Sequence, residues 1–265
     1  MIDPQAQGQG RFLGFTPRQL NVGFLTAVGA AAAGICVWLF AFGGLDSITG
    51  DSTTEEGVVD TTAREISNAD LERIALRPEQ FPTEYAGFAA DEDNGPLTLE
   101  KNANQAFDPI EQRAQFESSG WVTGYDAAYR DRQPAPDKAF FLDTQLDLFK
   151  TVDGAAGFFT TQMAEATQHQ GQAKDNVTEV EASLFDVSVA EQSAGFRGHY
   201  RVQLEDGSQR EYWQIGIAFR RGRLLGSVTL AGLELSDAGR QVLEGHAADL
   251  ANRLNNQMTA ALSTR

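Results

Sequence analysis

An uninterrupted apolar run near the N-terminus, Val22 to Phe42, constrains this chain more than any other feature. No charged side chain occurs from Gln19 through Leu45. At a rise of about 1.5 Å per residue, a helix of that length crosses a hydrocarbon core of roughly 30 Å. Thr16 and Pro17 form a suitable N-cap and first-turn pair, and Gly43-Gly44 is a suitable end. The run therefore predicts a single transmembrane helix.

The alternative is a cleaved secretory signal, because Ala41-Phe42-Gly43 has the small-x-small form that a signal peptidase accepts. The apolar region of such a signal covers only about 7–15 residues, so the length favours a retained anchor. Arg11 and Arg18 precede the run, and no Lys or Arg follows it until Arg64. By the positive-inside rule, we expect residues 1–16 to form a cytoplasmic tail, residues 17–44 to span the membrane, and the rest to be periplasmic or at the cell surface.

Composition separates the remainder into a tether and a domain. Residues 45–68 are rich in Asp, Glu, Ser, Thr and Gly, which predicts a flexible acidic tether, and residues 69–265 are expected to form the extracytoplasmic domain. The formal net charge of −16 disfavours nucleic acid as a partner. The single cysteine, Cys36, lies inside the apolar run, so the domain must be stabilised by its core without an internal disulfide.

Hydrophobic periodicity predicts an α+β domain with a mainly antiparallel sheet. A short helix at Ala69–Leu76 comes first, and two strands follow, one carrying Trp121, Tyr125 and Tyr129 on one face, the other running from Ala139 to Lys150. The second strand places Phe140, Leu142, Leu146 and Leu148 on one face and Asp143, Gln145 and Asp147 on the other. A helix capped by Asp153, about four further strands and a helix from Ser236 complete the order.

The residues offer no catalytic or metal-binding pattern. His169, His199 and His246 are scattered over a predicted loop, strand and helix without ligand spacing. The domain contains no cysteine, which excludes thiol chemistry there. We therefore expect a protein that is not an enzyme and that needs no cofactor or metal.

Three groups of residues are candidates for binding. Small residues at spacings of three or four along the apolar run favour packing against another transmembrane helix, and they are Gly23, Ala27, Ala30 and Gly34. Four aromatic residues, otherwise expected in the core, are candidates for lining a ligand cavity, and they are Trp121, Tyr125, Phe158 and Trp213. Arg220, Arg221 and Arg223 form a local positive cluster at a predicted hairpin tip, where they would contact a partner or lipid headgroups, or discourage edge pairing.

The order of these elements resembles the Mog1/PsbP-like α/β/α group. The resemblance rests on the strand Phe140–Phe149 running into the helix around Gly154–Phe159, and on the run Phe219–Thr229 before the closing helix. It covers about residues 119–262. Members include bacterial LpqN-type lipoproteins and outer sensor domains of membrane kinases, so the resemblance implies binding, assembly or sensing.

Together these features predict a single-pass membrane protein, in contact with membrane lipid, whose outer domain binds other proteins. The expected role is that of an accessory or assembly subunit of a larger membrane complex, with other transmembrane subunits as partners. The alternative is a ligand-binding or sensor module that holds a small apolar molecule in an aromatic-lined cavity.

Overall fold

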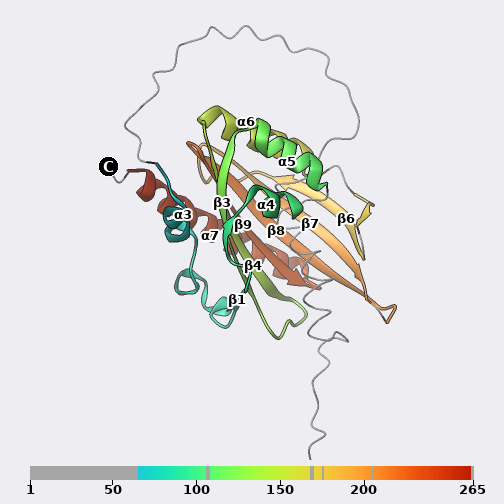
Figure 1. Ribbon diagram of the computed structural model, residues 1–265. Helices are drawn as coiled ribbons and strands as arrows, with labels where there is room; N and C mark the ends of the chain where they lie inside the picture. Colours follow the sequence, from blue (N-terminus) through green and yellow to red (C-terminus); the bar gives the residue numbers. More distant parts are fainter. Residues whose placement is uncertain (1–64, 106–107, 168–169, 175, 205, 264–265) are drawn as a thin grey trace, which may run out of the picture.

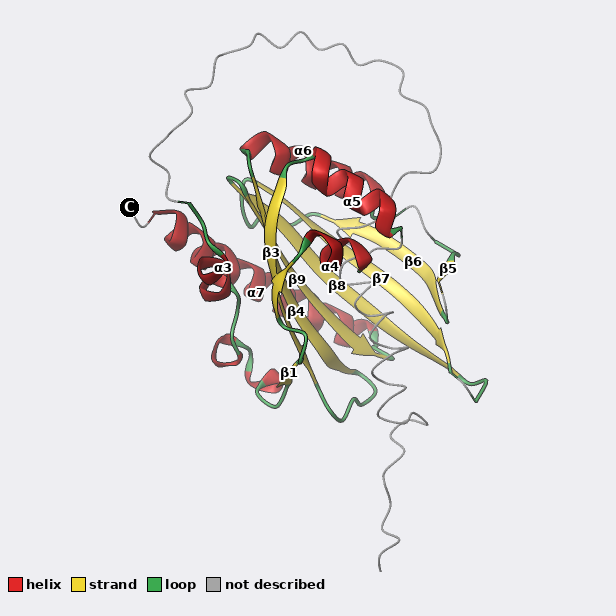
Figure 2. Cartoon of the chain, viewed as in Figure 1, coloured by secondary structure: helices red, strands yellow, loops and turns green. Residues whose placement is uncertain are grey.

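The computed structural model describes residues 65–105, 108–167, 170–174, 176–204 and 206–263. These residues form one antiparallel sheet of nine strands in the order β1-β3-β4-β9-β8-β7-β6-β5, with β2 paired to β3 (Figure 1). Helices pack on both faces of the sheet (Figure 2). The α+β class with a mainly antiparallel sheet is thus confirmed.

Five strands of ten or more residues, β3, β4, β7, β8 and β9, make up most of the sheet. The strands are β1 (Ala89–Ala90), β2 (Gly95–Leu97), β3 (Trp121–Arg130), β4 (Lys138–Phe149), β5 (Ala173–Lys174), β6 (Val177–Phe185), β7 (Gln192–Gln203), β8 (Gln209–Arg221) and β9 (Leu224–Leu233). The helices are α3 (Asn68–Ile74), η3 (Pro78–Gln80), η4 (Thr83–Tyr85), α4 (Leu99–Asn104), α5 (Pro109–Ser118), α6 (Val152–Glu165) and α7 (Asp237–Ser263).

The helix ends differ from the predicted ones by one or two residues. Ser67 caps α3 in a reciprocal capping box with Asp70, so the helix begins one residue earlier than its predicted start. Thr151, and not Asp153, caps α6, because its hydroxyl accepts a hydrogen bond from the backbone N–H of Gly154 at 2.9 Å. The region between residues 83 and 118 holds η4, two short strands and the helices α4 and α5.

One face of the sheet carries an extended apolar core beneath α3 and α7. Alternate residues of the central strands point to this side, including Leu146 and Leu148 of β4 and Ile215 and Ile217 of β8. The buried stripe of α7 packs on them, formed by Leu243, Ala247, Leu250, Ala251, Leu254 and Met258. We call this side the α7 face. The closing helix therefore lies against the sheet through its single apolar stripe.

A bulge in β3 changes which face its first residue occupies. The β3–β4 register shifts between Trp121 and Thr123, so the extra residue Val122 reverses the alternation. Tyr125 and Tyr129 point to the α7 face, whereas Trp121 packs on the opposite one. The expectation that Trp121, Tyr125 and Tyr129 share one face was wrong, because it assumed an unbroken period of two.

The opposite face, which we call the α6 face, has three zones along the strands. Under α5 and α6 lies an aromatic cluster that includes Phe116, Phe149, Phe158 and Phe196. A polar belt follows, made by Asp126, Asp143, Gln145, Asp147, Gln214, Ser227 and Thr229. The third zone is a strand cluster, composed of Ala128, Phe140, Phe141, Val177, Tyr200, Val202, Leu204, Tyr212, Ala231 and Leu233.

No helix among the described residues has the length and apolarity needed to cross a bilayer. The predicted transmembrane helix at residues 17–44 and the tether at 45–68, apart from its last four residues, lie outside the described part of the chain.

Candidate functional site

Two of the four predicted cavity residues lie together in the aromatic cluster. The ring of Phe116 stacks on that of Phe158 at a centroid distance of 4.9 Å and lies 5.3 Å from that of Trp121. Phe158 also contacts Phe149 at 5.1 Å. These rings fill the space between α5, α6 and the sheet, so they pack against one another.

The other two predicted cavity residues lie on the α7 face. Tyr125 packs at the margin of the large apolar core. Trp213 stacks on the ring of His199 at 4.6 Å and lies under the guanidinium of Arg240, 4.2 Å from the ring centroid. Trp121, Tyr125, Phe158 and Trp213 therefore do not line a common cavity. The bulge at Val122 and the alternation of β8 separate them.

The three arginines near the β8–β9 turn are each engaged within the domain. Arg220 is only 8% exposed and forms an ion pair with Glu191 at 2.7 Å. Arg221 donates to Oδ1 of Asn255 on α7 at 2.9 Å. Arg223 donates to the carbonyl oxygen of Lys150 at 3.4 Å. Arg220 and Arg221 thus point to opposite faces of the sheet, and Arg223 lies at the turn. The contact of these arginines with a partner stays a prediction.

The small-residue stripe of Gly23, Ala27, Ala30 and Gly34 lies outside the described residues. Its role in helix packing also stays a prediction.

Asp147 is the most elaborately bonded member of the polar belt. Its carboxylate accepts hydrogen bonds from the indole nitrogen of Trp121 at 2.6 Å, from Nδ2 of Asn102 at 2.9 Å and from Nε2 of Gln145 at 2.8 Å. Burial raises the pKa of Asp147 to about 6, although these three donors act in the opposite direction. Asn102 comes from α4, so this carboxyl group links that helix to β3 and β4.

Asp126 and Asp143 form a carboxyl pair in the same belt. The two side chains share a hydrogen bond, and burial raises the pKa of each. The charge of Asp126 raises the pKa of Asp143 further, so the pair holds a proton where an exposed aspartate would be ionised. Oδ1 of Asp143 has no hydrogen-bond partner in the described part of the chain, and neither has Oγ1 of Thr229, which stands opposite it on β9.

Two glutamates on the α6 side also have raised pKa values. Burial raises the pKa of Glu165 on α6 to about 8, although a hydrogen bond with Gln115 acts to lower it. Burial raises the pKa of Glu179 on β6 to about 7, although a hydrogen bond with Tyr200 acts to lower it. Five carboxyl groups associated with this face of the sheet thus favour the protonated form more than exposed carboxyl groups do.

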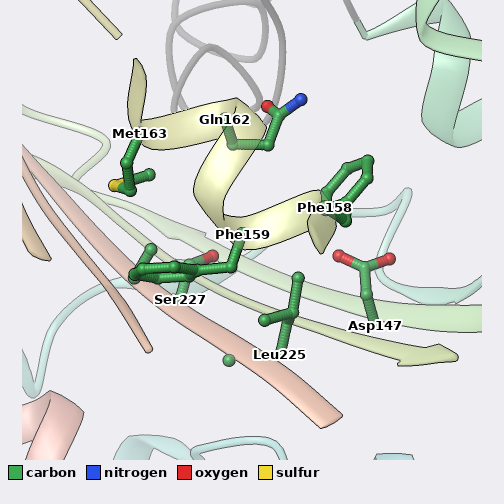
Figure 3. A pocket seen from close by; sticks show the side chains of 9 residues that line it. Asp147, Phe158, Phe159, Gln162, Met163, Leu225 and Ser227 are labelled. Atoms are coloured by element: carbon green, nitrogen blue, oxygen red, sulfur yellow. The ribbon is translucent and has the colours of Figure 1, made fainter. Parts of the chain in front are cut away.

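A small cavity lies beside the belt, between α6 and the sheet (Figure 3). Its volume is about 20 Å³, close to what one buried water molecule requires. In Figure 3 the carboxyl group of Asp147 points from the sheet toward Phe158 on α6. The lining residues are Asp147, Phe158, Phe159, Gln162, Met163, Ala218, Leu225, Gly226 and Ser227.

The belt does not assemble a recognisable reaction centre. Among the described residues, no group of three or more His, Cys, Asp or Glu side chains is placed to hold a metal ion. Asp147 has its donors around it, and Asp126 and Asp143 bond to each other. What the belt does is divide the α6 face into two apolar zones.

The strand cluster is the zone beyond the belt. All ten of its members lie on strands or directly after one, and none on a helix. Tyr200 stacks on Tyr212 at 5.0 Å, and Phe140 approaches Tyr212 edge-on at 6.1 Å. In Figure 2, α5 and α6 lie over the opposite end of the sheet. The strand cluster is therefore a group of buried apolar strand residues at one end of the α6 face.

Sequence reasoning did not identify the strand cluster or the belt as sites. Alternation within each strand predicts which residues share a face, but not which part of a face a helix covers. The available signal was a change from apolar to polar side chains along one face of two strands. On β4 it runs from Phe140-Phe141 to Asp143, Gln145 and Asp147. On β9 it runs from Ala231 to Thr229 and Ser227.

Comparisons with known proteins add a structural likeness. No family model matches the sequence, and no curated protein matches it. The solved extracellular domain of PknH from Mycobacterium tuberculosis is similar, with 11% sequence identity and a TM-score of 0.43. The similarity covers 72% of this chain and all of that domain.

Proposed function

We propose that this chain is a non-enzymatic, single-pass membrane protein whose extracytoplasmic domain binds other proteins through the strand cluster. The observation that carries the proposal is an apolar cluster built from strand residues alone, at the end of the α6 face away from α5 and α6. The role that fits is that of an accessory or assembly subunit of a membrane complex.

The dimensions of the strand cluster favour a protein partner. Its members extend from Ala128 on β3 to Val177 on β6, across six neighbouring strands. At a strand spacing of about 4.8 Å, that width is roughly 24 Å, enough for the apolar face of a helix. The cavity on the other side of the belt has space for about one water molecule only.

The test is the size of the native species in mild detergent. The proposal expects the full chain to migrate in a complex larger than one chain, and Val202→Asn on the strand cluster to release it as a single chain. Val122→Asn, at the 47% exposed bulge residue, should leave the complex intact, and circular dichroism must show that Val202→Asn, at a 1% exposed position, still folds. Wild-type protein that migrates alone would refute the subunit role.

A small apolar molecule is the second candidate for the same surface. The stacked rings of Tyr200 and Tyr212, with Phe140 edge-on, favour it because such rings commonly line apolar ligand sites. Native mass spectrometry of the detergent-free domain distinguishes a small ligand from a protein partner. A bound small mass that Val202→Asn removes would support the ligand. Wild-type protein without any bound mass would support the protein partner.

We further propose that the domain is related to the Mog1/PsbP-like group and faces the outside of the cell. The element order supports the first part, since α5, β3, β4 and α6 precede five consecutive strands and the closing helix α7. The charge distribution around the apolar run supports the second. Protease added to intact spheroplasts should digest the domain, and protection from the protease would contradict that orientation.

A further inference from the structure

The cavity between α6 and the sheet combines a buried carboxyl group with a buried hydroxyl group. Asp147 is 2% exposed and Ser227 is 5% exposed, and both line the cavity together with side chains of α6 (Figure 3). The cavity volume of about 20 Å³ exceeds the roughly 10–15 Å³ that one buried water molecule needs. Sites for drug-sized molecules measure roughly 300–1,000 Å³. A single water molecule is therefore the ligand whose size fits this cavity.

The strand register gives the two polar groups a separation that a water molecule can bridge. Asp147 pairs with Leu225 across the β4–β9 ladder. Ser227 pairs with Gln145, so Asp147 and Ser227 are diagonal neighbours on one face of the sheet. Diagonal neighbours lie about 7–8 Å apart, which is too far for two short side chains to bond directly. A water molecule with two hydrogen bonds of about 2.8 Å joins oxygen atoms roughly 5.5 Å apart.

We propose that the cavity binds one internal water molecule, which bridges the carboxyl group of Asp147 and the hydroxyl group of Ser227. The other side chains of the lining are apolar apart from Gln162, so these two polar groups hold the water. The inference goes beyond the proposed function, because the cavity and the strand cluster lie on different sides of the polar belt.

The hydrogen bonds around Asp147 leave room for such a partner. A carboxylate offers about four acceptor positions, and three of them receive the N–H groups of Trp121, Asn102 and Gln145. The indole of Trp121 can only donate, and Oδ1 of Asn102 already accepts a hydrogen bond from Nε2 of Gln145 at 3.2 Å. The water therefore takes the fourth position of the ionised carboxylate as a donor.

The same water gives Asp147 a partner when the carboxyl group is protonated. Burial raises the pKa of Asp147 to about 6, and the charge of Asp126 on β3 acts in the same direction. Asp147 is the one titratable residue among the nine described residues that line the cavity. Both forms of this carboxyl group thus occur near neutral pH. Because a water molecule can turn, it donates to the carboxylate and accepts from the carboxylic acid, which a fixed N–H group cannot do.

The number of long-lived internal water molecules tests whether the site is occupied. Magnetic relaxation dispersion of the water signal measures this number on the full chain in detergent micelles. Ser227→Val removes the hydroxyl group and fills the cavity with methyl groups, so it should lower the number by one. Ser227→Ala removes the hydroxyl group without added bulk and should also lower it, so the test does not depend on the larger variant. Circular dichroism shows that each variant folds.

Thr144→Val is the matched control. Thr144 is 0% exposed on β4, and its hydroxyl group donates to the carbonyl oxygen of Ala127 at 3.5 Å. It alternates with the belt residues of β4, so its side chain points to the opposite face from the cavity. Thr144→Val should leave the number of internal waters unchanged. The proposal is overturned if wild type and both Ser227 variants hold the same number, or if Thr144→Val lowers it equally.

Infrared spectroscopy tests the role of the water toward the proton of Asp147. At pH 5 the protonated carboxyl group contributes a carbonyl stretching band, which its loss in Asp147→Asn assigns. In Ser227→Val this band should move to higher frequency, because the O–H group no longer has the water as its acceptor. In Thr144→Val the band should stay in place. An unchanged frequency in Ser227→Val would show that the proton of Asp147 has another acceptor and would overturn the bridging role.

Discussion

The indole nitrogen of Trp121 donates a hydrogen bond of 2.6 Å to Oδ1 of Asp147, across the β3–β4 pair. The contact exists because the bulge at Val122 turns Trp121 to the α6 face. It connects the aromatic cluster under α6 to the polar belt, and it supplies one of the three donors that hold a buried carboxylate in its ionised form.

Trp121→Phe should destabilise the domain more at pH 8 than at pH 5. Above its pKa of about 6, Asp147 is ionised and loses a charge-assisted hydrogen bond, which costs on the order of 2 kcal/mol. Urea denaturation at both pH values measures the difference. A pH-independent loss for Trp121→Phe would contradict the role of its N–H group.

The buried carboxyl groups predict that the domain is more stable in mild acid. Burial raises the folded-state pKa of Asp147 to about 6, of Glu179 to about 7 and of Glu165 to about 8. The folded state then retains protons that the unfolded chain releases. Its extra stability is present below the unfolded pKa values near 4 and is lost as pH rises through about 6 to 8.

We expect the free energy of unfolding to fall by on the order of 3 kcal/mol between pH 5 and pH 8.5. A urea titration at half-unit pH steps measures this slope. Glu165→Gln should flatten it between pH 6 and pH 8, whereas Glu100→Gln, at an exposed position of α4, should leave it unchanged. A stability maximum at pH 8 would show that these groups are ionised in the folded domain.

The sequence predicted the fold class because most strands keep an unbroken alternation. Ile215 and Ile217 on β8 and Leu146 and Leu148 on β4 point to one side without interruption, and α7 carries one apolar stripe to cover them. These signals are local, so they can be detected within a window of a few residues.

The candidate sites could not be predicted in the same way. One inserted residue, Val122, moved Trp121 away from Tyr125, and a bulge has no reliable local signal. The polar belt follows the alternation of β4, yet Asp143 and Asp147 are buried because α4 and neighbouring strands supply partners from distant positions. Such burial depends on tertiary contacts, which a periodic pattern does not contain.

Two glycines of α6 should respond oppositely to alanine. A Cβ atom at Gly154 would lie 2.2 Å from the carbonyl oxygen of Ser119, whereas one at Gly157 meets no atom within 4 Å. Gly154→Ala should therefore cost about 1–3 kcal/mol through overpacking. Gly157→Ala should gain about 0.5–1 kcal/mol, because alanine loses less backbone entropy on forming a helix.

Thermal unfolding of the two variants, followed by circular dichroism, measures this contrast. Because both substitutions add the same methyl group to the same helix, helix propensity alone predicts equal gains. Equal shifts in Tm would mean that α6 does not pack against the C-terminal end of α5 as closely as the structure has it.

Asp143→Asn should stabilise the domain at pH 8. Asp126 and Asp143 repel each other when both are ionised, and burial raises the pKa of each. Asparagine has nearly the same shape and keeps a hydrogen bond to Asp126, but removes one buried charge, so we expect a gain of about 1–2 kcal/mol. The gain should be smaller at lower pH, because the pair is protonated to a greater extent there.

The double variant of Asp126→Asn and Asp143→Asn tests whether the two carboxyl groups act as a unit. Replacing either one already relieves the repulsion, so the second replacement should add little, and the gains measured by urea denaturation at pH 8 should be strongly non-additive. Fully additive gains would contradict the coupling. Asp143→Ala should instead destabilise at every pH, because it leaves Asp126 without its partner and opens a cavity beside Thr229.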